Sequence, residues 1–280
     1  MVSGRGEARV KTGSLHLVGK YRKLQQKRGW AWGLAVAVVK PTLLATTKQE
    51  WEGAEKIPEK GGCILALNHV SHIDPLTAAH ITWDYGRQSR YLAKSSLFKN
   101  KYFAYFMRSA GQIPVDRGAG AGALDEAIAA VRAGELVVVY VEGSITKDPA
   151  GWPMKGKTGA ARIALATGCP VIPVGQWGAQ ELLPAYSAKP NLKGRKLIKM
   201  KVGDPVDLRD LEAQEHTPAV YNEATDRIMK AIVELVADVR GEEPPAELFD
   251  PKKHGISATG NPNKSRTRDA DAHRSTGETA

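Results

Sequence analysis

Short, wholly apolar runs that alternate with amphipathic stretches constrain this sequence more than any other feature. The clearest run is 136–141, LVVVYV, and a second run, 63–68, follows a pair of glycines. Apolar runs of this length are typical of strands buried on both faces of a sheet. The stretch from Leu124 to Val131 has helical apolar spacing and ends near Gly134. This alternation predicts an α/β fold with a mixed, largely parallel sheet flanked by helices.

The same reasoning assigns the other elements of the body, which we place at residues 48–240. We expect further helices over 75–82, 102–109, 159–167 and 220–240, and further strands over 91–93, 112–115, 171–174 and 197–202. Pro173 lies inside one of these strands. Because proline donates no ladder hydrogen bond, we expect that strand near a sheet edge or a bulge.

The N-terminal segment, residues 1–47, is basic and then apolar. Residues 1–28 contain eight Lys or Arg and one acid, a net +7 out of +10 for the chain. The apolar stretch 29–39 contains Trp30 and Trp32, and it is shorter than the roughly 20 residues that a spanning helix needs. We expect a helical, interfacial segment that docks peripherally on the anionic cytoplasmic face of the cell membrane. The alternative is a buried helix that covers part of the core.

The composition bears on the C-terminal segment, the cysteines and the class of binding partner. Residues 241–280 have few large apolar side chains, which predicts a disordered tail. Cys63 and Cys169 lie in apolar runs and form no C-x-x-C pair, so they fit core positions in a reducing compartment. The net charge suggests an anionic partner. Nucleic acid is not expected, because no nucleic-acid motif is visible and only 6% of the residues are aromatic.

The candidate catalytic residues lie between a predicted strand and a predicted helix, in the run N-H-V-S-H-I-D-P at 68–75. If the chain turns into a helix after Ser71, Asp74 can accept a hydrogen bond from one ring nitrogen of His69. The other ring nitrogen is then available as a general base. The alternative is that Asp74 caps the helix beside a histidine with a structural hydrogen bond.

Three later segments carry further polar groups. Arg117 comes just past a predicted strand in the run 111–117, where a guanidinium can bind phosphate with two hydrogen bonds. Residues 140–147, YVEGSITK, follow the clearest strand and bring hydroxyls and a lysine to the carboxyl end of the sheet. The run 169–174 is an apolar strand with a proline near each end.

In order and spacing these four segments resemble the glycerolipid acyltransferase family, that of the 1-acylglycerol-3-phosphate acyltransferases. The family blocks are N-H-x4-D, G-x-I-x-x-x-R, F-P-E-G-T-R-S and V-P-I-x-P-V, and the resemblance covers residues 50–205. The third block departs from the pattern, because Ile145 stands in place of its arginine. Val141 and Ser144 replace its proline and threonine. Lys147 or Lys155 could supply the missing charge, as point charges without the arginine fork.

The resemblance implies an enzyme that moves an acyl group from an acyl thioester, acyl-CoA or acyl carrier protein, to the hydroxyl of lysophosphatidate. It implies His69 as the general base and Asp74 as its partner. The residues implied for acceptor phosphate binding are Arg117, Glu142, Gly143, Ser144 and Lys94. Backbone N–H groups near 141–143 are candidates for the oxyanion hole. No metal and no organic cofactor are implied. Glycerol 3-phosphate, or another lipid or glycolipid, is the alternative acceptor.

Two other classes fit less well. A metal-dependent hydrolase would use His69, His72 and Asp74, but the spacing differs from an H-x-H-x-D-H cluster and Pro75 stands where the last histidine belongs. A non-enzymatic membrane-binding protein would explain the basic N-terminus but not the four blocks.

Overall fold

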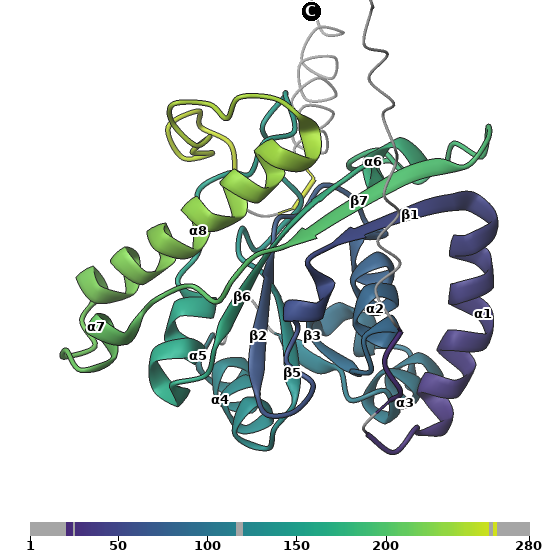
Figure 1. Ribbon diagram of the computed structural model, residues 1–280, viewed down its shortest axis with the longest axis horizontal. Helices are drawn as coiled ribbons and strands as arrows, with labels where there is room; N and C mark the ends of the chain where they lie inside the picture. The colour runs from purple at the N-terminus through teal and green to yellow at the C-terminus, as the bar shows by residue number, and fades with distance from the viewer. Residues whose placement is uncertain (1–20, 25, 116–119, 258–259, 262–280) are drawn as a thin grey trace, which may run out of the picture.

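The computed structural model describes residues 21–24, 26–115, 120–257 and 260–261 of the 280-residue chain. Seven strands form one sheet in the order β1-β7-β6-β2-β5-β3-β4 (Figure 1). β6 and β7 are antiparallel, and every other pair of neighbours is parallel. The predicted mixed, largely parallel sheet is therefore confirmed. The strands are β1 (Thr47–Glu52), β2 (Cys63–Leu67), β3 (Ser89–Lys94), β4 (Ile113–Val115), β5 (Leu136–Tyr140), β6 (Val171–Trp177) and β7 (Lys196–Val202).

Helices cover both faces of the sheet (Figure 1). They are α1 (Trp30–Thr46), α2 (Asp74–Asp84), α3 (Lys101–Ser109), α4 (Gly120–Arg132), α5 (Gly159–Thr167), α6 (Ala179–Leu182), α7 (Arg209–Glu212) and α8 (Pro218–Arg240). Two short 3-10 turns lie at Ala54–Lys56 and Ser95–Phe98. The helices predicted from apolar spacing are all present, and α5 has the predicted bounds. The sequence analysis missed β1, which is polar and follows α1 directly.

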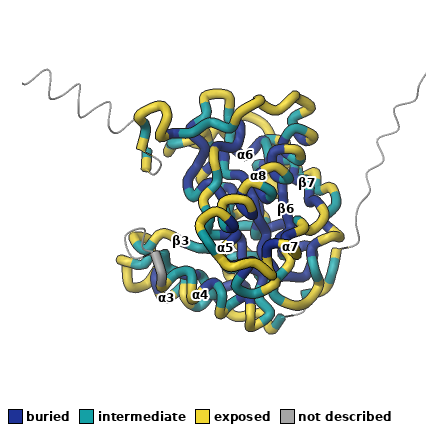
Figure 2. The backbone as a smooth tube through the Cα atoms, turned by 90° about the vertical axis from the view of Figure 1, so that its left-hand side faces the viewer, coloured by how far each residue is buried: buried dark blue, intermediate teal, exposed yellow. Residues whose placement is uncertain are grey.

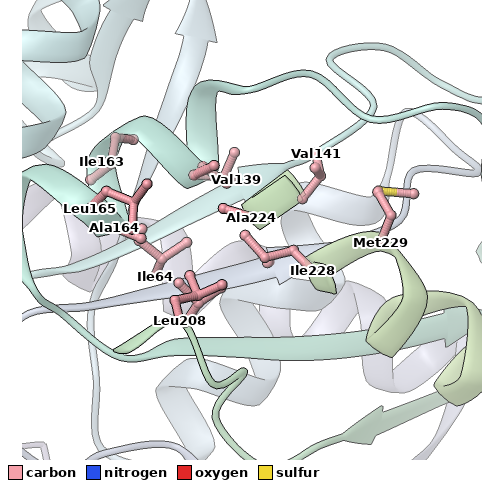
Figure 3. Close-up of a cluster of buried hydrophobic side chains, with 14 of the residues drawn as sticks. Ile64, Val139, Val141, Ile163, Ala164, Leu165, Leu208, Ala224, Ile228 and Met229 are labelled. Carbon is pink, nitrogen blue, oxygen red and sulfur yellow. The ribbon is translucent and has the colours of Figure 1, made fainter. Parts of the chain in front are cut away.

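The alternating side chains of the central strands divide the core into two clusters. On one face Ile64 and Val139 pack against α4, α5 and α8. Figure 3 shows residues of α5 and α8 in this cluster. On the other face Leu65 and Val138 pack against α2. Figure 2 shows the buried backbone running through the middle of the molecule. Because helices cover both faces of the sheet, these strands are apolar throughout and do not alternate with polar residues. Their continuous apolar runs made them recognisable in the sequence.

Pro173 does not lie at a sheet edge, so the edge position expected for its strand was wrong. It lies in β6, which has neighbours on both sides. The ladder with β7 begins only at Val174, and the Pro173 carbonyl accepts a hydrogen bond from the N–H of Gly203. Proline at 173 therefore precedes the first residue that pairs with β7, so its lack of an N–H removes no hydrogen bond from the β6–β7 ladder.

The helix α1 is buried on one side and exposed on another. One side is buried: Trp32 is 6% exposed, and its Nε1 donates to the carbonyl of Ala110 at 3.0 Å. Another side leaves Trp30, Leu34 and Val38 more than half exposed. Within the described residues, no helix is both long and apolar enough to cross a membrane. The basic residues of positions 1–20 lie outside the described part of the chain.

The segment after α8 differs from the predicted disordered tail over its first part. Residues 241–257 return to the domain, where Phe249 forms a backbone bridge with Met154. The N–H of Lys155 donates to the Phe249 carbonyl at 3.0 Å, and Leu248 packs against the larger core cluster. Leu248 and Phe249 are among the few large apolar residues of this segment, so they explain why it packs. Residues 258–259 and 262–280 lie outside the described residues.

Candidate active site

The candidate site lies at the carboxyl ends of parallel strands, as expected for an α/β sheet. His69 comes just after β2, Glu142 just after β5, and Lys94 is the last residue of β3. These strands are neighbours in the order β2-β5-β3. Arg117 follows β4, the next strand in the sheet, but it lies outside the described residues.

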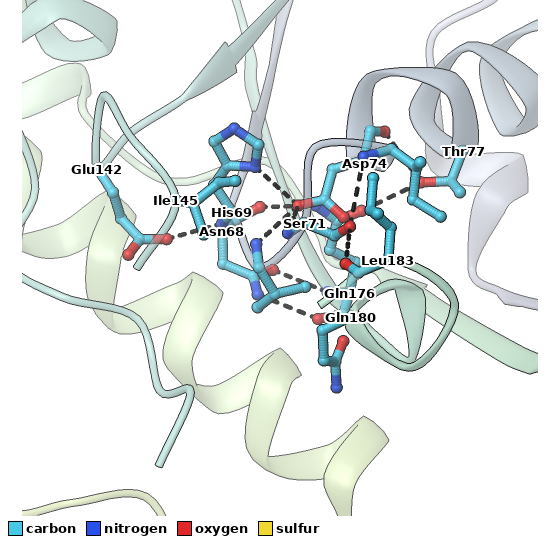
Figure 4. A network of polar contacts seen from close by, with 12 residues as sticks. Asn68, His69, Ser71, Asp74, Thr77, Glu142, Ile145, Gln176, Gln180 and Leu183 are labelled. Carbon is cyan, nitrogen blue, oxygen red and sulfur yellow. Dashed lines mark hydrogen bonds and ion pairs between the residues drawn. The ribbon is translucent and has the colours of Figure 1, made fainter. Parts of the chain in front are cut away.

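The predicted hydrogen bond between His69 and Asp74 is present. Nδ1 of His69 lies 2.7 Å from Oδ2 of Asp74 (Figure 4). The same oxygen accepts the backbone N–H groups of Val70 at 2.7 Å and Ser71 at 2.8 Å. Asp74 is the first residue of α2, so the turn that starts the helix also fixes the carboxylate. Asp74 therefore binds the imidazole and holds the turn before α2, but it does not cap the helix as the alternative expected, since the N-cap is Ile73 and has no side-chain hydrogen bond.

This geometry determines which ring nitrogen of His69 faces away. The Asp74 side chain is fully buried, whereas the His69 side chain is 15% exposed. Figure 4 shows the second ring nitrogen pointing away from the polar network. A carboxylate that binds Nδ1–H selects the tautomer with a lone pair on Nε2 and stabilises the imidazolium after protonation. The pair can thus accept a proton from a hydroxyl at the exposed side of the ring.

Asn68 and Gln176 hold the start of this turn against β6. The Asn68 side chain donates to the Gln176 carbonyl at 3.0 Å and accepts the Gln176 N–H at 2.9 Å. The Gln176 side chain in turn donates to the Asn68 carbonyl at 2.7 Å. Both residues are almost completely buried. The sequence analysis missed Gln176, whose only signal is a polar residue that follows the apolar run 171–174.

The loop after β5 binds both backbone polar groups of His69. Oε1 of Glu142 accepts the His69 N–H at 2.7 Å, and the N–H of Thr146 donates to the His69 carbonyl at 2.8 Å. Oε2 of Glu142 accepts the N–H of Met154 at 2.9 Å. Glu142 is 1% exposed. Burial raises its pKa to about 8, although the two backbone hydrogen bonds act in the opposite direction and lower the pKa.

Tyr140, the last residue of β5, packs against the imidazole. The two ring centroids are 4.3 Å apart and the planes are inclined by 24°. Burial raises the pKa of Tyr140 well above its usual range, so the phenol is neutral. The sequence analysis treated this position as part of an apolar strand, and its closeness to His69 follows only from the pairing of β2 with β5.

The other predicted residues of the third block lie in the same loop. Gly143 has a left-handed backbone with φ of 71°, a conformation that favours glycine, and Ser144 is buried. The predicted oxyanion donors are not available at two positions. The N–H of Val141 donates to the Leu67 carbonyl at 3.1 Å, and the N–H of Gly143 donates to the Tyr140 carbonyl at 2.9 Å. In the described part of the chain, no three His, Cys, Asp or Glu side chains cluster as a metal site would require.

Comparison with known proteins identifies the domain. Residues 48–177 match the family model described as Acyltransferase. The chain is 28% identical over 178 residues to the 1-acyl-sn-glycerol-3-phosphate acyltransferase of Bacillus subtilis, covering 62% of this chain and 83% of that protein. These matches support the glycerolipid acyltransferase family, which the four sequence blocks resemble. The named relatives and the family model also support an acyltransferase enzyme.

Two further proteins are similar to this chain. The 1-acyl-sn-glycerol-3-phosphate acyltransferase of Borreliella burgdorferi is 31% identical over 125 residues, which are 44% of this chain and 48% of that protein. The crystal structure of the 1-acyl-sn-glycerophosphate acyltransferase of Thermotoga maritima has a TM-score of 0.58 at 21% identity. That similarity covers 76% of this chain and 81% of the other. At this identity it establishes the shared fold.

Proposed function

We propose that this acyltransferase moves a fatty acyl group from an acyl thioester to the free hydroxyl of 1-acylglycerol 3-phosphate. The observation that carries the proposal is the His69–Asp74 pair, held at 2.7 Å at the carboxyl end of the sheet. Curated relatives in three bacteria bear the name 1-acyl-sn-glycerol-3-phosphate acyltransferase, which supports this acceptor.

The proposed reaction needs no covalent acyl-enzyme. Nε2 of His69 takes the proton of the acceptor hydroxyl as its oxygen bonds to the thioester carbonyl carbon. Asp74 stabilises the imidazolium that forms. When the tetrahedral intermediate collapses, the carbon–sulfur bond breaks and the imidazolium returns its proton to the leaving thiolate. Atoms and charge balance, with the thiol of coenzyme A or acyl carrier protein and the acylated acceptor as products.

We assign the remaining residues according to where they lie. Lys94, Arg117, Gly143 and Ser144 belong to the acceptor side of the site, because they end or follow β3, β4 and β5, the strands on one side of β2. Glu142 differs, since both of its carboxylate oxygens accept backbone hydrogen bonds, one of them from His69. We therefore give Glu142 the role of positioning His69 in place of the predicted contact with phosphate.

Product analysis tests the proposed reaction. The full chain is incubated with labelled acyl-CoA or acyl carrier protein and with lysophosphatidate, glycerol 3-phosphate or neutral monoacylglycerol, and the products are identified by mass spectrometry. We expect phosphatidate from lysophosphatidate. Transfer to glycerol 3-phosphate alone would support the alternative acceptor, and transfer only to the neutral lipid would contradict a phosphate-binding site. The two thioesters distinguish the donors.

We also propose that the enzyme docks peripherally on an anionic membrane at its cytoplasmic face through α1. The exposed side of α1 carries Trp30, Leu34 and Val38, and Trp30 stacks on Tyr105 of α3, itself 65% exposed. The adjoining N-terminal segment is basic. Apolar burial and attraction to anionic headgroups would then act together.

Vesicle co-sedimentation tests this docking. Leu34→Glu places a charge on the exposed side of α1, whereas Ala219→Glu adds the same charge at the exposed start of α8, on the opposite side of the molecule (Figure 1). We expect Leu34→Glu to reduce binding to anionic vesicles and Ala219→Glu to leave it unchanged, and high salt to weaken wild-type binding. Equal sedimentation of the two variants would show that the membrane contact lies elsewhere.

A further inference from the structure

The family pattern has an arginine at the position of Ile145 in this sequence. Another cationic side chain is therefore needed to bind the phosphate of the acceptor. Ile145, at that position, is 3% exposed and lies within the polar network of Figure 4. The sequence analysis offered Lys147 and Lys155 as replacements for this arginine, but both side chains contact the C-terminal segment. Nζ of Lys147 donates to the carbonyl of Ser257. Nζ of Lys155 lies 3.8 Å from the carboxylate of Asp250.

Lys157, which the sequence analysis did not consider, lies against the loop after β5. Its N–H donates to the carbonyl of Val141 at 2.8 Å, so the chain returns to the end of β5 at this residue. The side chain of Lys157 lies close to Gly143. A Cβ on Gly143 would lie 2.9 Å from Cδ and 3.0 Å from Nζ of Lys157. Glycine at 143 is favoured by its positive φ, and the end of the lysine side chain lies directly over it.

The loop under Lys157 is the one that holds the general base. Glu142 and Thr146, on either side of Gly143 in the sequence, bind the backbone of His69. Lys157 is an exposed residue, so it borders the solvent from which an acceptor approaches. In lysophosphatidate the reacting hydroxyl and the phosphate are on adjacent carbon atoms. A cation that binds the phosphate must therefore lie at the same edge of the sheet as His69, and Lys157 does.

We propose that Lys157 binds the phosphate of the acyl acceptor and takes the place of the arginine missing at Ile145. This inference rests on the proposed function. A lysine ammonium group is a point charge with three donors, so it binds a phosphate dianion without the fixed planar geometry of arginine. Gly143 contributes by leaving room for the lysine stem.

Steady-state kinetics of the full chain test the role of Lys157. Four proteins are compared: wild type, Lys157→Gln, Lys157→Arg and the control Lys155→Gln, another exposed lysine two residues away. The Lys157→Gln variant keeps most of the stem and removes the charge. We expect it to raise the KM for lysophosphatidate by about tenfold to a hundredfold, in the range of a charge-assisted hydrogen bond. The KM for acyl-CoA should change little, and Lys157→Arg should retain most of the affinity.

The outcomes separate this inference from the proposed function. If wild type acylates lysophosphatidate and Lys157→Gln behaves like Lys155→Gln, the inference is wrong and the function stands. If Lys157→Gln raises the KM for acyl-CoA in place of that for the acceptor, the lysine binds the phosphates of the donor and the inference is also wrong. If wild type does not acylate lysophosphatidate, the proposed function fails, whatever the variants do. Thermal unfolding of each variant checks that the fold is retained.

Discussion

The two halves of the active site are built in different ways. The proton-transfer half, made of His69, Asp74, Asn68 and Gln176, is held by a network of short hydrogen bonds around a fully buried carboxylate. The proposed acceptor half, with Lys94, Lys157 and Arg117, has long cationic side chains, and the two described lysines are exposed. A general base needs one tautomer at one angle, whereas a phosphate can be attracted by charges on flexible stems.

The largest expected effect is in the proton-transfer half. His69→Ala removes the base, so kcat should fall by at least about 10²–10⁴-fold, the usual contribution of general-base catalysis. His72→Ala is the matched control, because His72 is exposed and not bonded to Asp74. Its loss should be severalfold at most. Both rates are measured with saturating lysophosphatidate and acyl-CoA, and equal losses in the two variants would contradict the assigned base.

Asp74→Asn should have the next largest effect. The amide still offers an oxygen, but it can no longer both accept from His69 Nδ1–H and carry the charge that stabilises the imidazolium. We expect a loss in kcat of about 10²-fold or more with little change in either KM. Because Asp74 also accepts two backbone N–H groups, unfolding by denaturant should be followed as well. A variant with normal kcat but lower stability would show that Asp74 serves only the turn.

The same contrast explains how far the sequence could predict the site. His69 and Asp74 are five residues apart, so a turn into a helix after Ser71 brings them together, and their hydrogen bond could be expected from the sequence on that condition. The apolar strands were predictable because both faces of the sheet are covered. Gln176 and Lys157 reach the site only through strand pairing and a returning loop. Tertiary contacts of this kind leave no periodic or local pattern, so these residues were missed.

Arg117→Ala should have a smaller effect, confined to the acceptor half. If the guanidinium binds phosphate with two hydrogen bonds, its loss should raise the KM for lysophosphatidate by about tenfold and leave the KM for acyl-CoA almost unchanged. Arg117→Lys should restore the affinity only in part. A raised KM for the thioester with a normal KM for the acceptor would move Arg117 to the donor side, and the acceptor half would then depend on the lysines.

The last expected effect is on stability, at the residue that connects the two halves. Burial raises the pKa of Glu142 to about 8, from an ordinary value of 4.5. Between these two values the folded protein therefore holds a proton that the unfolded chain releases. The resulting stabilisation is complete below the unfolded pKa and is lost as the pH rises through the folded pKa, by at most about 1.4 kcal/mol for each pH unit.

Urea unfolding at several values between pH 5 and pH 9 measures this slope. Glu142→Gln should remove the part of the slope that belongs to this carboxyl, whereas Glu50→Gln, at an exposed position of β1, should leave it intact. Glu142→Gln should also lower kcat, because an amide can accept only one of the two backbone N–H groups that the carboxyl holds. An unchanged slope together with a normal kcat would mean that the His69 backbone is held without Glu142. The proton-transfer half would then depend on Asp74, Asn68 and Gln176 alone.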